Sequence, residues 1–276
     1  MQNIVQTLSS PNRKTELPKK FMNLSAKAWF LTTVVGQWLF AFYVAAFYGG
    51  SAMSGDFMKW NRVLPHGYSE GETMGNLAVA LHLLFSVIVL LGGPLQFSAK
   101  LRAKFPKFHR VSGRIYIFSG ILISLSGVYM VFTKGTVSGW LGDVSISINA
   151  FLVVLCAFFA IQQARQKQFA SHQRWAMRLF LVMSGVWFFR IGLMFWLFVN
   201  GGPLGFDPVT FRGPFLVFLG FSQYILPLLF AEIFFWATKR KKANTYYAMS
   251  GVLAGLIVFT AIGTLAATLM MWLPRL

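Results

Sequence analysis

Seven long apolar runs are the feature that most constrains how this chain can fold. A helix needs about 20 mostly apolar residues to cross the hydrocarbon core of a bilayer. Runs of roughly this length cover residues 28–48, 77–97, 111–132, 144–162, 175–199, 214–238 and 246–273. Each should be helical, because lipid cannot satisfy the backbone of an exposed strand edge. The sequence therefore predicts an all-α, polytopic membrane bundle with seven transmembrane helices.

The composition and the N-terminal segment agree with this prediction. Hydrophobic residues make up 56% of the chain and charged residues 12%, about half the charged share of a soluble domain. The first apolar run is longer than the core of a signal peptide, so we expect it to stay in the protein as a span. We therefore divide the chain into a basic tail, residues 1–27, and a seven-span domain, residues 28–273.

The charged residues predict the orientation. Lys and Arg concentrate in the tail and in the second, fourth and sixth connections, as in cytoplasmic loops. We therefore expect a cytoplasmic N-terminus, an external C-terminus and a place in the plasma membrane. The net charge is +18, but the basic residues lie in short loops between apolar runs, so we reject nucleic acid as a partner.

Several familiar kinds of site are missing from the sequence. Cys156 is the only cysteine and lies in an apolar run, which rules out a disulfide framework and a cysteine-ligated zinc site within one chain. There is no H-E-x-x-H motif, Walker loop or nucleotide-binding glycine fingerprint. The sequence leaves open whether the protein is an enzyme.

The stretch "KFPKFHRVSGRIY", residues 104–116, places a histidine among arginines where the third span begins. Pro106 suits the first turn of a helix. Helical spacing then puts His109, Gly113 and Tyr116 on one face. The neighbouring basic side chains are those of Arg110 and Arg114.

A second stretch, "SHQRWAMRLF" (residues 171–180), repeats this arrangement where the fifth span begins. Ser171 is a plausible N-cap for a helix that starts with His172. Arg174 and Arg178 follow with a four-residue spacing. Because the third and fifth spans run in the same direction, both stretches should lie at the cytoplasmic surface.

These two stretches together suggest a haem site. Positive helix N-termini and nearby arginines disfavour a charged imidazole, so both histidines should be neutral, the form that ligates metal. We predict b-type haem with His109 and His172 as the metal ligands and the arginines on the propionates. Gly113 should leave room for a flat group. The alternative is that the basic residues follow only from membrane orientation and the histidines have no role.

His82, in "LAVALHLLF" of the second span, is a separate candidate. At 1.5 Å per residue it lies about 24 Å from the cytoplasmic surface, too far to share an iron with the other two candidates. A haem on His82 would need His66 or, less well, Met194. The alternative is a hydrogen bond between helices.

Arg190 lies about 18 Å beyond Arg178 in the fifth span, near the depth of His82. An unpaired arginine at that depth costs a few kcal/mol, so it should face an anion such as a propionate, a lipid or quinone headgroup, or a carboxylate. Glu232 should lie too far from Arg190 to pair with it, and either pairs with Arg178 or carries protons. We expect kinks at Pro94 and Pro227.

These motifs resemble a bacterial membrane-protein family of unknown function, which implies a place in the inner (plasma) membrane of a bacterium. The matching elements are His82, G-P-x-Q-F at residues 93–97, H-R-x-x-G-R-x-Y at 109–116 and H-x-R-W-x-x-R at 172–178. The layout is also loosely similar to the cytochrome b561 class of transmembrane electron carriers, which implies haem and electron transfer. Proteins of that class place their histidine pairs well inside facing helices, whereas two of the histidines here lie at an edge.

Three functions remain open for this protein of the lipid bilayer. It is a haem b electron carrier, with a quinone or another membrane redox protein as partner; a metal-free carrier for an anion or lipid headgroup; or a non-catalytic scaffold that packs through Gly251 and Gly255. The candidate binding residues are His109, His172, His82, Arg110, Arg114, Arg174, Arg178, Arg190 and Tyr116.

Overall fold

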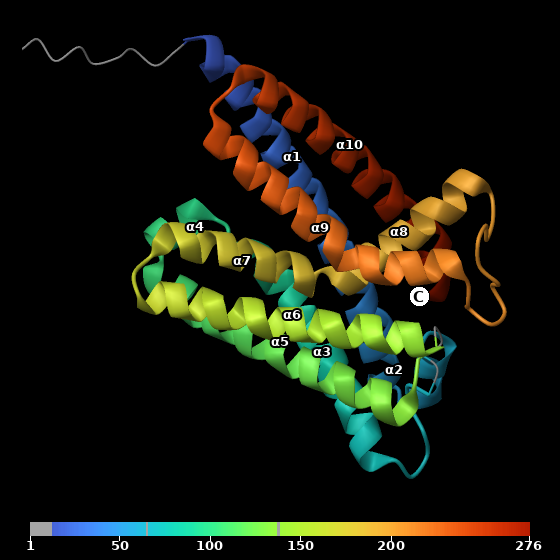
Figure 1. Cartoon of the computed structure of the whole chain (residues 1–276). Helices are drawn as coiled ribbons and strands as arrows, with labels where there is room; N and C mark the ends of the chain where they lie inside the picture. The colour runs from blue at the N-terminus through green and yellow to red at the C-terminus, as the bar shows by residue number, and fades with distance from the viewer. Residues whose placement is uncertain (1–12, 65, 137–138) are drawn as a thin grey trace, which may run out of the picture.

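The computed structural model describes residues 13–64, 66–136 and 139–276, and this part of the chain is helical (Figure 1). The α-helices are α1 (Arg13–Val44), α2 (Gly50–Met53), α3 (Thr73–Leu95), α4 (Ala99–Lys104), α5 (Pro106–Lys134), α6 (Gly139–Arg165), α7 (Phe169–Met183), α8 (Gly185–Asn200), α9 (Pro214–Arg240) and α10 (Ala243–Ala267). Turns of π-helix, Ala45–Gly49 and Thr268–Trp272, extend α1 and α10, and 3₁₀ turns cover Phe57–Arg62 and Leu273–Arg275.

The predicted all-α membrane fold is confirmed. Six helical segments of the described chain are long and apolar enough to cross a membrane, and the bent pair α7 and α8 makes seven if it is one span. The first segment begins earlier than predicted, because residues 13–27 of the expected tail already belong to α1. Residues 1–12 of that tail lie outside the described residues. The orientation across the membrane stays a prediction.

The fifth predicted span, residues 175–199, is not one straight helix. It is broken at Ser184 into α7 and α8, which meet with a bend of 53°. Sharp kinks commonly occur at Ser and Gly pairs, and Gly185 follows the break. The Ser184 hydroxyl accepts a hydrogen bond from Gln37 Nε2 at 2.7 Å and donates one to the Phe180 carbonyl at 2.7 Å. A contact with α1 therefore holds the break.

The two prolines lie at different places in their helices. Pro94 lies in the last turn of α3, so it marks the end of that helix. Helix α9 runs from Pro214 to Arg240 with Pro227 inside it, and its ribbon changes direction partway along, in agreement with the predicted kink (Figure 1). Among the described spans, the break at Ser184 is the one large bend at a short break between two helices.

The bend at Ser184 joins two groups of helices (Figure 1). Helices α3, α5, α6 and α7 pack in one group, with α3 on α5, α5 on α6 and α6 on α7. Helices α1, α9 and α10 lie together in the other. Helix α7 packs mainly on α6, whereas α8 packs on α10, so the fifth span passes from one group to the other.

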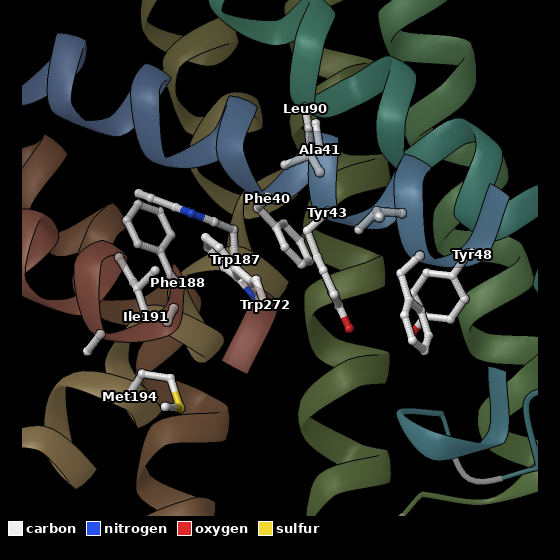
Figure 2. Close-up of a cluster of buried hydrophobic side chains, with 14 of the residues drawn as sticks. Phe40, Ala41, Tyr43, Tyr48, Leu90, Trp187, Phe188, Ile191, Met194 and Trp272 are labelled. Carbon is white, nitrogen blue, oxygen red and sulfur yellow. The ribbon is translucent and has the colours of Figure 1, made fainter. Parts of the chain in front are cut away.

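A cluster of aromatic side chains fills the junction between α1, α8 and the C-terminal turn (Figure 2). Trp187 and Trp272 are almost completely buried. Trp272 stacks on Phe40 and Tyr43, with ring centroids 5.2 and 6.2 Å apart. Because these rings come from distant parts of the sequence, the cluster fixes the position of α8 against α1.

Candidate functional site

The two predicted metal ligands lie at the same end of the bundle. His109 is half-buried in the first turns of α5, and His172 is half-buried in the first turn of α7. His172 Nδ1 lies 2.9 Å from the Ala160 carbonyl oxygen. His172 is also close enough to His109 to exert an electrostatic effect on its ring, as is Arg102. The structure therefore brings the two histidines into one neighbourhood.

The predicted arginines around these histidines have different surroundings. Arg110 and Arg114 are exposed, on the side of α5 away from its buried face. The Arg174 guanidinium lies over the ring of Phe235, 5.8 Å from its centroid. These three side chains extend from α5 and α7 at the end of the bundle where both helices begin.

Arg178 is engaged in an ion pair. Its Nε donates a 2.7 Å hydrogen bond to Glu232 Oε1, and its guanidinium lies 4.6 Å from the centroid of the Trp175 ring. The pairing with Glu232 that the sequence suggested is present. Arg178 therefore joins α7 to α9 and shares its charge with a carboxylate.

Gly113 does not leave free space beside His109. Gln96, the C-cap residue of α3, fills it, since its Oε1 lies 3.1 Å from the position that a Cβ would take at residue 113. Gln96 Nε2 also donates a 2.9 Å hydrogen bond to Ser112 Oγ. The glycine thus serves the packing of α3 against α5.

Tyr116 packs in a similar way. It is buried, and its Cε2 lies 2.9 Å from the position of a Cβ at Gly93. The G-P-x-Q-F and H-R-x-x-G-R-x-Y motifs therefore meet across the α3–α5 contact, each glycine facing a side chain of the other motif. This contact accounts for part of the pattern through packing.

His82 makes the hydrogen bond between helices that was the alternative to a ligand role. Its Nδ1 lies 3.0 Å from Ser126 Oγ of α5. The two proposed partners for a haem on His82 lie elsewhere. His66 is exposed in a loop, where its carbonyl accepts a hydrogen bond from Lys134, and Met194 is buried in the aromatic cluster.

His82 and Arg190 line one cavity within the membrane-spanning part of the chain. We call it the polar cavity; its volume is about 340 Å³ and its walls come from α1, α3, α5, α6, α8 and α9. The sequence placed these two residues at a similar depth, and the structure shows that they face the same space.

Arg190 has no acidic partner among the residues that the structure describes. Its Nη1 donates to the Val186 carbonyl at 3.3 Å, and its guanidinium lies 5.0 Å from the centroid of the Phe40 ring. Arg275, in the C-terminal turn, is close enough to Arg190 to exert an electrostatic effect. This side of the polar cavity is therefore positively charged.

Three further residues of the polar cavity carry a buried polar atom without a partner. Tyr43 Oη, Asn149 Oδ1 and Trp187 Nε1 have no hydrogen-bond partner within the described chain. A buried polar group without a partner costs about 1–3 kcal/mol, so these atoms are unfavourable in the described chain. In Figure 2 the Tyr43 hydroxyl points away from the rings of the cluster.

The sequence analysis missed these three residues. Tyr43 and Trp187 look like ordinary aromatic residues of a span, and only the folded chain shows that their polar atoms lack partners. Asn149 carried the one available signal, an amide in the middle of an apolar run. Among the described residues no group of three or more His, Cys, Asp or Glu side chains is placed to hold a metal ion.

The helices and their apolar surfaces define a multi-pass integral membrane protein. Residues 79–211 of the chain match the model of the family described as predicted membrane protein (DUF2306), whose function is unknown. The matched segment includes His82 and all the motifs from which the resemblance was drawn. A search of curated proteins and a search of solved structures gave no match to this chain.

Proposed function

We propose that this protein binds an anionic amphiphile in the polar cavity, with the headgroup on Arg190. The observation that carries the proposal is a guanidinium that lines an intramembrane cavity and has no acidic partner in the described chain. This is the metal-free carrier among the three functions that the sequence leaves open.

The physical argument starts from the cost of the charge. An arginine at the centre of a membrane helix costs about 2.5–3.5 kcal/mol on insertion scales, and such residues usually mark a ligand path or pair with an opposite charge. A carboxylate or phosphate would accept two parallel hydrogen bonds from the guanidinium. Tyr43 and Trp187 offer further donors on the same cavity wall.

The test is equilibrium binding to purified protein in detergent. Radiolabelled oleate is the probe, and the competitors are oleoyl lysophosphatidate and oleyl alcohol, which distinguish carboxylate, phosphate and neutral headgroups on the same chain. We expect oleate or lysophosphatidate to bind at least tenfold more tightly than the alcohol. Arg190→Gln should remove this preference, and Arg240→Gln, at an exposed arginine, should keep it. Equal binding of all three compounds would count against the proposal.

A second candidate is b-type haem held by His109 and His172. The observation in its favour is that His172 lies close enough to His109 to exert an electrostatic effect on it, and that the Ala160 carbonyl engages Nδ1 of His172, so that Nε2 would be the nitrogen for a metal. Bound haem would supply one-electron chemistry toward a quinone or a redox protein. The surroundings differ from the expectation, because Gln96 fills the space beside Gly113 and Arg178 is paired with Glu232.

A visible spectrum before and after dithionite tests this second candidate. A reducible Soret band should appear, and His109→Ala and His172→Ala should each lose it, whereas His82→Ala should keep it. A colourless preparation from haem-replete cells would contradict the haem hypothesis and leave the proposal for the polar cavity untouched.

A further inference from the structure

A second cavity lies on the other side of α8 and α9 from the polar cavity. We call it the apolar cavity; its volume is about 550 Å³ and its walls come from α1, α7, α8, α9 and α10, with Phe97 from the turn after α3. Almost all the side chains in its walls are apolar. The exceptions are Lys27, Ser222, Gln223 and Thr260, together with the indole N–H of Trp29.

Neighbouring residues of α8 and α9 face the two cavities alternately. On α8, Trp187 and Arg190 line the polar cavity and Phe188 lines the apolar one. On α9, Gly220 lines the polar cavity and Ser222 the apolar one. The two helices therefore form a shared wall.

Gln223 is the residue that lines both cavities. Its Nε2 donates a 2.8 Å hydrogen bond to the Gly220 carbonyl, which folds the side chain back along its own helix. At this side chain a single residue separates the two cavities. Ligand sites are mostly apolar and contain a few polar groups at defined positions. The polar cavity would suit the headgroup of an amphiphile, and the adjacent apolar cavity would suit its hydrocarbon chain.

We infer that the apolar cavity holds the hydrocarbon chain of the same ligand, which passes Gln223 from its headgroup at Arg190. The inference rests on the proposed function and adds the substrate class, a long-chain anionic amphiphile. Two features of the protein determine which ligand binds. The guanidinium of Arg190 favours an anionic headgroup, and the apolar cavity favours a long hydrocarbon chain.

Binding of octanoate and oleate tests the inference, since the two probes share a headgroup and differ in length. Ser222→Phe, which adds bulk inside the apolar cavity, should weaken oleate binding at least tenfold and change octanoate binding less than twofold. The matched control is Leu229→Phe on the exposed side of α9, which should change neither. If Ser222→Phe leaves oleate binding unchanged, or weakens both probes equally, the inference is wrong.

Photolabelling of the unaltered chain provides a second readout. Oleate with a diazirine at its terminal carbon should label the residues of α10 that line the apolar cavity and not the polar one, and excess unlabelled oleate should suppress the labelling. These residues are Met249, Leu253, Leu256, Phe259 and Thr260. Labelling that excess oleate does not suppress would overturn the inference. Failure of the headgroup proposal looks different, because Arg190→Gln would then bind octanoate and oleate as tightly as the unaltered protein.

Discussion

The guanidinium of Arg190 lies 5.0 Å from the centroid of the Phe40 ring, so an α8 cation rests on an α1 aromatic side chain. A cation–π contact of this kind contributes about 0.5–2 kcal/mol. That is less than the insertion cost of an arginine in the middle of a span, about 2.5–3.5 kcal/mol. The ring therefore offsets only part of the insertion cost of Arg190. An anion bound to the guanidinium would offset the rest.

This balance predicts that Arg190→Met stabilises the ligand-free protein. Removing the charge should raise the free energy of unfolding by about 1 kcal/mol and the melting temperature by about 2–4 °C. Thermal unfolding in detergent measures the change. Arg190→Lys, which keeps the charge, should show no gain. A Met variant that melts several degrees lower would mean that the native contacts of Arg190 already exceed its desolvation cost.

Gly93→Ala should disrupt the contact of α3 with α5. The new methyl group would lie 2.9 Å from Tyr116 Cε2 and 3.3 Å from Phe180 Cδ2, and overpacking of this kind costs about 1–3 kcal/mol. Gly92→Ala is the matched control, because a Cβ there meets no atom within 4 Å. We expect lower thermal stability for Gly93→Ala only. If Tyr116→Leu restores part of the thermal stability lost in Gly93→Ala, the loss is due to the Tyr116 ring. An equal loss of stability in Gly93→Ala and Gly92→Ala would contradict the packing of Gly93 against Tyr116.

The Arg178–Glu232 ion pair should contribute modestly to stability. The two side chains are 20% and 52% exposed, and pairs with such access to solvent typically contribute about 0.2–1 kcal/mol. A double-mutant cycle with Arg178→Gln and Glu232→Gln, read by thermal unfolding, isolates the coupling between them. A coupling energy of zero would show that the contact joining α7 to α9 adds nothing to stability.

The architecture could be predicted from the sequence because the bilayer dictates it. Each apolar run had to be a helix of about the length needed to span, and the structure agrees at six segments and one bent pair. The bend itself was not predicted. Ser184 and Gly185 permit it, but the hydrogen bond from Gln37 that holds it joins residues 147 positions apart, and no local pattern reveals such a contact.

The candidate site was predicted in part, for a similar reason. Helical rise along the chain put His82 and Arg190 at similar depths, and the structure shows both in the polar cavity. The depth of a residue in the membrane does not show which side chains of neighbouring helices pack beside it. The sequence could therefore not show that Gln96 occupies the space at Gly113, nor that Tyr43 Oη lacks a partner.

The carboxyl resonance of [1-¹³C]oleate bound to the purified protein tests the central claim most directly. A guanidinium in contact with the headgroup favours the ionised form and lowers the pKa of the bound carboxyl group. We predict that this resonance titrates at lower pH in the unaltered protein than in detergent micelles, and that Arg190→Gln abolishes the difference. The same titration curve in both proteins would contradict a headgroup site at Arg190.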